Sequence, residues 1–199
     1  MNYHSQVLAP VPKIIDHDRY RAELLVKCFD LFTSQGYAAI TMRQIAIGLN
    51  VSTGTLYHYF DSKEAIFEQM VWMRVEQGLR EIGGQINLSD SINVKIQSVF
   101  EQIGRIQDEL FRELILYADY YQYQQRNGIK RSEILINMFK AFQPEIKNTI
   151  GITNPHAAQL IFSAIDGLLL SQIYDCKIDW IAQGKMMGDL MEKYAEELS

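Results

Sequence analysis

Residues 41–64 read TMRQIAIGLNVSTGTLYHYFDSKE and predict two short helices joined by a tight turn. Thr41 and Ser52 are good N-cap residues, because their hydroxyl groups accept a hydrogen bond from a free backbone N–H of the first turn. Asn50 lies between the two segments and readily takes the left-handed conformation that a tight turn demands. This pair of helices has the outline of a helix-turn-helix, whose second helix enters the major groove of DNA.

The second of these helices begins with residues suited to DNA contact. Residues 52–55, Ser-Thr-Gly-Thr, are small or hydroxylated, so their backbone amides and hydroxyl groups can reach phosphate oxygens. Tyr57 and His58 add hydrogen-bonding groups one turn later, and Leu56 and Phe60 are expected to face inward. Spacing alone does not decide the question, because many helical proteins contain such a pair and rings at 57–60 can serve packing only.

The same stretch resembles the DNA-binding domain of the TetR family of one-component transcriptional regulators. Thr-x-x-x-Ile-Ala and Val-Ser-x-Gly-Thr-Leu-Tyr-x-Tyr-Phe-x-Ser-Lys-Glu occur together at the family's spacing, and the resemblance is close over residues 20–67. Two positions depart from it: Leu49-Asn50 replaces the usual Ala-Gly, and Thr53 stands where a basic residue is frequent. The resemblance implies DNA contacts by Thr41, Arg43, Ser52, Thr53, Gly54, Thr55, Tyr57, His58 and Lys63, with Lys63 holding a phosphate from the start of the next helix.

The surrounding sequence predicts an all-α protein. Residues 1–15 contain Pro10 and Pro12 and predict a flexible arm, and Ala22, Leu25, Val26, Phe29 and Phe32 predict one buried helix face that ends at Gly36. A long linking helix begins at about residue 62, and further helices are expected at about 90–107, 109–126, 130–148, 155–176 and 182–197. We therefore expect a three-helix DNA-binding domain at 16–67 and a larger helical ligand-binding and dimerisation domain at 68–199.

The last two helices carry more apolar residues than one intramolecular core requires. A regulator that reads a palindrome must present two recognition helices about 34 Å apart, which requires a dimer. The two helices are therefore predicted to form a four-helix dimer interface; the alternative is that they are two ordinary core helices of a monomer. The predicted interface residues are Ala157, Leu160, Ile161, Ala164, Ile165, Leu168, Leu169, Ile173, Met187, Leu190 and Met191.

Aromatic residues are concentrated in the middle of the chain. Tyrosine combines a broad apolar body with one polar tip, which suits a pocket for an amphipathic small molecule, although a helical core with tyrosines at its rim explains the same pattern. The candidate ligand-binding residues are Phe100, Ile103, Phe111, Leu114, Tyr117, Tyr120, Tyr121, Met138, Phe139 and Phe142.

Composition narrows the class of protein. The net charge of −5 lies entirely beyond Ile66, since six acidic residues match six basic ones before it, so the predicted DNA-binding end is less acidic than the rest. Cys28 and Cys176 are expected to be buried free thiols in a reducing compartment. Without a signal-like start or about 18 consecutive apolar residues, the expected location is the cytoplasm and no membrane partner is expected. No catalytic motif, cofactor motif or metal-ligand spacing is present, so we expect neither an enzyme nor a metal site.

These patterns together predict a homodimeric regulator, most simply a repressor, that a small molecule releases from a palindromic operator in double-stranded DNA. The alternative is a DNA-bound adaptor or sequestering protein without small-molecule induction. An exposed apolar or acidic patch on the larger domain, belonging to neither interface nor pocket, would favour that alternative, and the sequence leaves its existence open.

Overall fold

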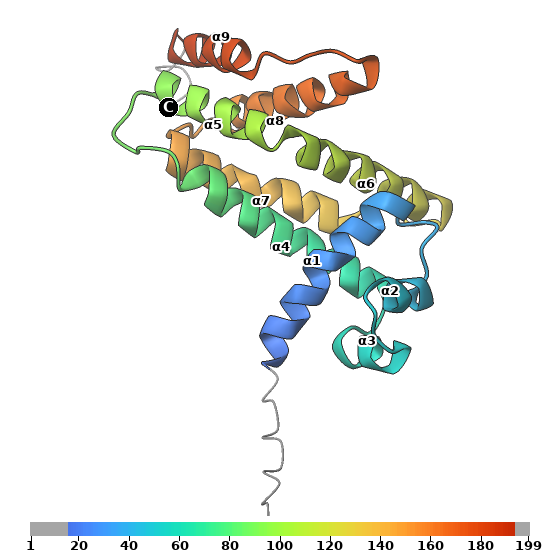
Figure 1. The fold of residues 1–199 in the computed structure, drawn as a ribbon. Coiled ribbons are helices and arrows are strands. Elements are labelled where there is room, and N and C mark those ends of the chain that lie inside the picture. The colour runs from blue at the N-terminus through green and yellow to red at the C-terminus, as the bar shows by residue number, and fades with distance from the viewer. Residues whose placement is uncertain (1–15, 194–199) are drawn as a thin grey trace, which may run out of the picture.

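A computed structural model describes residues 16–193, and every regular element in this range is helical (Figure 1). The predicted arm at 1–15 and the end of the predicted last helix lie outside the described residues. The elements are α1 (His17–Gln35), α2 (Met42–Gly48), α3 (Thr53–Tyr59), α4 (Lys63–Gly83), α5 (Ile92–Arg105), α6 (Gln107–Arg126), α7 (Glu133–Ile150), α8 (Pro155–Leu170), the short 3-10 helix η1 (Ser171–Tyr174) and α9 (Trp180–Lys193). The predicted all-α class is confirmed.

Side chains placed just before the helices define where they begin. Thr41 and Gln44 form a reciprocal capping box at α2, in which each side chain bonds the backbone of the other residue. Ser52 and Ser62 cap α3 and α4 in the same way, by accepting from the N–H groups of Thr55 and Ala65. Asn50 has a φ of 55° and so takes the left-handed conformation expected in the turn. The predicted starts of these three helices are therefore confirmed.

Three expectations need correction. In α1, Ala22 and Val26 are exposed, whereas Leu24 and Cys28 are buried, because the face that packs on α4 and α6 is rotated from the predicted one. The helix expected at about 130–148 begins only at Glu133 and continues through Pro144 as far as Ile150. Cys28 is a buried free thiol, and its burial raises its pKa to about 12. Cys176, in contrast, is exposed.

Two apolar clusters organise the molecule. One contains the inner residues of α1–α4 together with Leu116 and Tyr120 of α6 and Ile134 of α7. The other joins α5, α8 and α9 at the opposite end, shown at the top of Figure 1. The first cluster thus runs without a break from the helix-turn-helix into the larger helical part.

Aromatic rings in the first cluster connect the helix-turn-helix part to α6. Tyr120 of α6 stacks on Phe67 of α4 with ring centroids 4.1 Å apart, and it meets Tyr37 edge-on at 4.6 Å. All three rings are buried. Aromatic pairs at these distances add to the stabilisation from burial alone, so the loop before α2 is packed directly on the larger helical part.

Glycines allow α9 to approach α5 closely. A Cβ atom at Gly184 would lie 2.7 Å from the Cβ of Phe100, and one at Gly104 would lie 2.9 Å from Trp180. Gly188 meets the backbone and side chain of Asn93 in the same manner. Side chains at these three positions would push the helices apart, so the glycines determine how α9 is seated on α5 (Figure 1).

Candidate DNA-binding and effector sites

The inner face of α3 is held in place while its outer face is free. Leu56 and the following Phe60 are buried, and Ser52 accepts a 2.9 Å hydrogen bond from the N–H of Thr55. Thr53, Gly54, Tyr57 and His58 are exposed, with Tyr57 at 52% exposure. The start of α1 lies at the same lower end of the molecule as α3, away from α5 and α9 (Figure 1).

The start of α1 supports the end of α3. His17 Nδ1 lies 2.8 Å from the hydroxyl of Tyr59, and the rings of His17 and His58 are 6.0 Å apart. Tyr20 also contacts the ring of Tyr59. These contacts account for Tyr59 as a packing residue, as expected, and leave the Tyr57 ring directed away from the core. The sequence did not identify His17 as part of this group, because only the fold brings it to α3.

The remaining predicted contact residues are partly engaged within the chain. The hydroxyl of Thr41 takes part in the capping box, and that of Thr55 lies 2.8 Å from the hydroxyl of Ser52. Arg43 is exposed on α2, and no residue in the described range forms an ion pair with it. Arg43 is thus available for a phosphate, and a hydroxyl used in a cap keeps a lone pair for water or ligand.

Lys63 requires a correction. Its ammonium group donates to the backbone oxygens of Tyr37 and Ile40 at 2.8 and 2.9 Å and lies 4.3 Å from the centre of the Tyr37 ring. Burial lowers the pKa of this ammonium, and the nearby carboxylates of Glu64 and Asp119 oppose that effect. The side chain therefore ties the loop before α2 to α4, and we remove it from the expected phosphate contacts.

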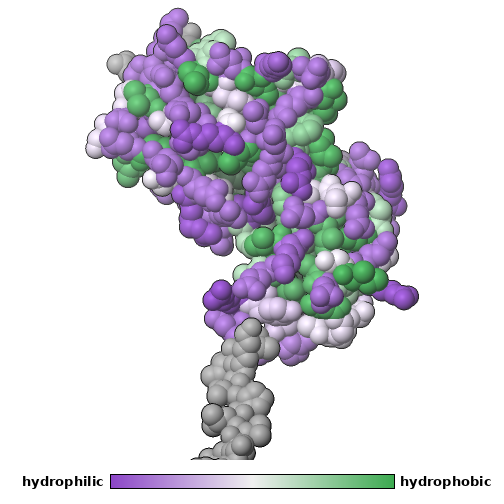
Figure 2. Space-filling view, viewed as in Figure 1, coloured by the Kyte–Doolittle hydropathy of each residue, from purple (hydrophilic) through white to green (hydrophobic). Residues whose placement is uncertain are grey.

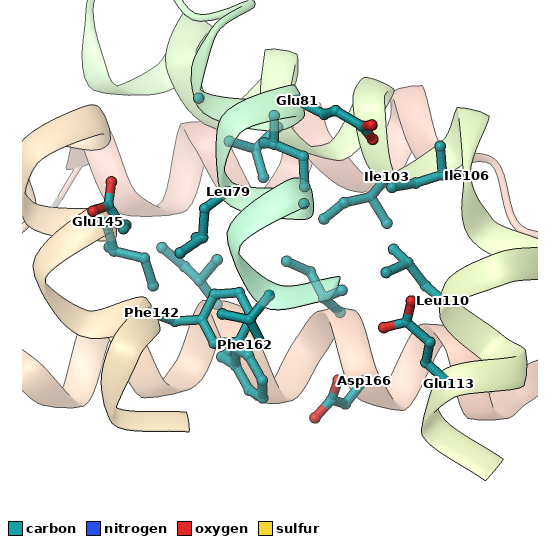
Figure 3. A pocket seen from close by; sticks show the side chains of 18 of the residues that line it. Leu79, Glu81, Ile103, Ile106, Leu110, Glu113, Phe142, Glu145, Phe162 and Asp166 are labelled. Atoms are coloured by element: carbon teal, nitrogen blue, oxygen red, sulfur yellow. The ribbon is translucent and has the colours of Figure 1, made fainter. Parts of the chain in front are cut away.

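A largely apolar cavity of about 200 Å³ lies among α4, α5, α6, α7 and α8 (Figure 3). Ile103, Leu114, Tyr117, Met138 and Phe142 line it, and these are five of the ten residues predicted to bind a ligand. The other five do not line it: Phe100 and Tyr120 are buried in the two clusters, Tyr121 is exposed, Phe139 packs on Phe162, and Phe111 lies outside the lining. Sequence reasoning missed the contributions of α4 and α8, including Leu79, Phe162, Ile165 and Asp166.

An ion-pair group on the wall of this pocket connects it to α1. Arg74 of α4 bonds Glu113 at 2.6 Å and Glu109 at 2.7 Å, both on α6, and its guanidinium lies 4.7 Å from the centre of the Phe29 ring in α1. Burial alone would lower the pKa of Arg74, but the two carboxylates raise it. Burial also raises the pKa of Glu113, against the effect of Arg74. Arg74 thus contacts both the pocket wall and the helix that carries the DNA-binding end.

Two further contacts join α6 to the DNA-binding end. Arg112 bonds Asp30 at 3.1 Å and Thr33 at 2.6 Å, both on α1. Asp119 accepts from the N–H of Ala38 at 3.2 Å, in the loop between α1 and α2. Since α6 also lines the pocket, its position is coupled to that of α1 and the loop before α2.

The predicted dimer residues divide between two faces. Ala157, Ile161, Leu169 and Met191 are buried within the chain, Ile165, Leu168 and Met187 pack on the second cluster, and Ala164 is half-buried. Leu160, Ile173 and Leu190 are exposed, as are Leu170, Tyr174, Ile181 and Met186, which were not predicted. Apolar surface is visible near the reversal between α8 and α9 at the upper right of Figure 2. The exposed set alone is therefore the candidate interface.

One segment among residues 16–193, Pro155–Tyr174, is long and apolar enough to cross a membrane by length and composition, and 22% of it is buried. This segment is α8 with η1, the same segment that carries part of the candidate interface. A single helix of this kind is weak evidence for a membrane location, because the core helices of other proteins meet the same criteria of length and composition.

Part of the chain resembles known bacterial transcription regulators in sequence. Residues 24–70 match the family described as bacterial regulatory proteins, tetR family. The Staphylococcus aureus biofilm operon icaADBC HTH-type negative transcriptional regulator IcaR is 32% identical over 91 residues, which are 45% of this chain and 49% of IcaR. The Rhodococcus jostii HTH-type transcriptional repressor KstR2 is 41% identical over 51 residues, about a quarter of each chain. The chain thus spans about half the length of IcaR and about a quarter of the length of KstR2.

Solved structures extend the likeness to the whole fold. Salmonella enterica GusR superposes with a TM-score of 0.67 at 20% identity, covering 91% of this chain and 99% of GusR. Bacillus subtilis FadR, solved in complex with stearoyl-CoA, superposes with a TM-score of 0.59 at 19% identity, covering 85% of this chain and 96% of FadR. At these identities the likeness concerns the fold. The chain therefore shares its overall fold with these regulators, and its N-terminal region, residues 24–70, matches the tetR family of bacterial regulatory proteins.

Proposed function

We propose that this protein is a dimeric, cytoplasmic transcription repressor that binds a palindromic operator and is released from it by a small molecule. The observation that carries the proposal is the outer face of α3. Thr53, Gly54, Tyr57 and His58 are exposed there on a helix whose inner face is firmly packed. Side chains of this kind at the start of a recognition helix contact phosphates and base edges.

Dimerisation supplies the second recognition helix. An exposed apolar set lies at the end of the molecule opposite α3 and contains Leu160, Leu170 and Ile173 of the α8–η1 segment and Ile181 and Leu190 of α9. An interface with an apolar core of this kind resembles that of stable homodimers. Pairing through it leaves both α3 helices free to enter successive major grooves.

The contacts of α6 support the proposed release by a ligand. This helix lines the pocket and also binds α1 through Arg112 and the loop before α2 through Asp119. A ligand that binds better when α6 is displaced favours a protomer arrangement in which the two α3 helices no longer match the operator. Ligand and operator then weaken each other's binding to the same degree. The ligand of FadR, stearoyl-CoA, supports a small-molecule role for this fold.

The test is selection of genomic fragments by the purified protein at near-physiological salt, followed by sequencing. We expect a palindrome with half-sites about one helical turn apart. Recovery of no enriched site by a folded dimer would contradict the proposal.

A matched pair of variants links the site to α3. Tyr57→Ala removes an exposed tyrosine from α3, and Tyr121→Ala removes one of similar exposure, 48% against 52%, from α6. We expect Tyr57→Ala to weaken operator binding about tenfold, as loss of one charge-assisted phosphate contact would. Tyr121→Ala should leave the affinity unchanged. Equal affinities for the two variants would remove Tyr57 from the DNA contact surface.

A further inference from the structure

The charges on the wall of the pocket are unbalanced. Arg74 is the one cationic side chain among the residues that line it, whereas Glu81, Glu113, Glu145 and Asp166 are acidic. The rest of the lining is mainly aliphatic and aromatic. A negative wall around an apolar space opposes the entry of an anion and attracts a cation.

Arg74 is already committed to other groups. Its guanidinium bonds Glu113 and Glu109 and lies over the ring of Phe29. Glu113 has a second partner, since it accepts a hydrogen bond from the hydroxyl of Tyr117 at 3.2 Å. A ligand carboxylate or phosphate would therefore find no free cation, and the charge of Glu113 is already compensated.

Asp166, unlike Glu113, has no partner for its carboxylate within residues 16–193. It projects from α8 among Phe162, Ile165 and Leu169, and no residue of the described range forms a hydrogen bond or an ion pair with it. Burial raises the pKa of this carboxyl to about 6. An uncompensated carboxylate in apolar surroundings is costly unless something pairs with it. Asp166 lines the pocket from α8, and Figure 3 draws it at the lower edge of the view, between Phe142 of α7 and Leu110 of α6.

We propose that the pocket binds a small organic ammonium ion whose charged group pairs with Asp166 and whose apolar body lies between α4, α7 and α8. The proposal rests on the small-molecule role proposed above and specifies its ligand class. The cavity of about 200 Å³ is somewhat larger than the roughly 150 Å³ cavity that holds benzene, so a single ring with a short chain fits.

A series of three probes of equal shape tests the charge requirement. These are 3-phenylpropylammonium, 3-phenylpropanol and 3-phenylpropanoate, titrated calorimetrically into the full-length protein at pH 7.5. We expect the ammonium to bind about tenfold or more tightly than the alcohol, because a hydrogen bond to a charged group contributes more than a neutral one. The carboxylate should bind weakest. Binding of the alcohol or the carboxylate as tightly as the ammonium, or of none of the three, would overturn the proposal.

Asp166→Asn identifies the anchoring group. This nearly isosteric change should weaken ammonium binding about 10- to 100-fold and leave alcohol binding within about twofold. Asp175→Asn, at an exposed aspartate outside the pocket lining, removes the same charge from the protein and should change neither. Ammonium binding that survives Asp166→Asn would refute the assignment.

Operator binding is measured on the same preparations. A protein that binds its operator but does not prefer the ammonium would disprove the ligand class and leave the DNA-binding function intact. A protein that prefers the ammonium but selects no DNA would instead disprove the proposed function.

Discussion

Replacing Gly184 with alanine tests the close contact between α5 and α9. The new Cβ would lie 2.7 Å from Phe100 Cβ and 3.3 Å from the Cα of Gln97, against about 3.5–4.0 Å for normal carbon contacts. Phe100 is only 1% exposed and packs against Trp180, so its side chain cannot move aside. The helices must therefore separate by several tenths of an ångström to about 1 Å.

The magnitude follows from two opposing effects. Overpacking of a buried contact costs about 1–3 kcal/mol. Alanine in a helix interior is favoured over glycine by about 1 kcal/mol. We therefore expect Gly184→Ala to lower the free energy of unfolding by up to about 2 kcal/mol, measured by urea denaturation at a fixed protein concentration.

Gly78→Ala is the matched control. Gly78 lies within α4, and a Cβ atom there would have no atom within 4 Å. This variant gains the helix preference without the clash, so its free energy of unfolding should rise by about 1 kcal/mol. If both variants shift stability in the same direction, the glycines do not act through the distance between α5 and α9, and the reasoning is refuted.

Three further predictions concern charge, assembly and specificity. Asp166→Asn should raise the free energy of unfolding on the order of 1 kcal/mol at pH 7.5 and much less at pH 4. Because burial raises the pKa of Asp166 to about 6, its ionised form destabilises the fold increasingly as the pH rises from about 4 to 6. Urea denaturation at both pH values measures this, and equal gains in stability would contradict it. The other ionisable groups facing the pocket are unchanged by the substitution: Arg74, Glu81, Glu113, Tyr117 and Glu145. Leu160→Glu should give monomers in analytical ultracentrifugation, whereas Leu88→Glu, at a more exposed leucine outside the candidate interface, should remain dimeric; a dimeric Leu160→Glu would exclude this surface. Thr53→Ala should change the half-site recovered by fragment selection, and recovery of the original half-site at uniformly lower affinity would assign Thr53 to phosphate contact only.

Local signals predicted the helix-turn-helix well. Helix starts depend on a side chain bonding a backbone group three residues away, so Thr41, Ser52 and Ser62 specify them within the sequence itself. The left-handed turn at Asn50 is equally local. The predicted roles of these residues in DNA binding remain predictions.

Contacts between distant segments were harder to predict. In α1 the apolar residues occupy more than one face, and only the position of α4 and α6 determines that Leu24 and Cys28 are buried while Ala22 and Val26 are exposed. Lys63 resembled a phosphate contact in the sequence, but the carbonyl groups that it binds come from the loop before α2. Partners of this kind become visible only once the chain is folded.

The pocket and the interface illustrate the same limit. An apolar residue in α8 can face the core, the cavity or a partner, and periodicity does not distinguish these environments. Ala157 faces the core, Phe162 and Ile165 line the cavity, and Leu160 is exposed. Aromatic content indicated a pocket in α6 and α7, but the enclosing walls from α4 and α8 are mainly aliphatic, with Phe162 as their one aromatic residue.

The stacking of Tyr120 on Phe67 and Tyr37 has a consequence for how the protein unfolds. Because the rings of the helix-turn-helix part and of α6 share one cluster, a fragment that ends after Phe67 would expose these rings to water. The DNA-binding end and the lower part of α6 therefore form one cooperative unit, with amide protons expected to exchange together. A motion that separates the two α3 helices of a dimer must then move this unit as a rigid body. The flexibility would lie where the unit joins the rest of its own protomer, or between the two protomers.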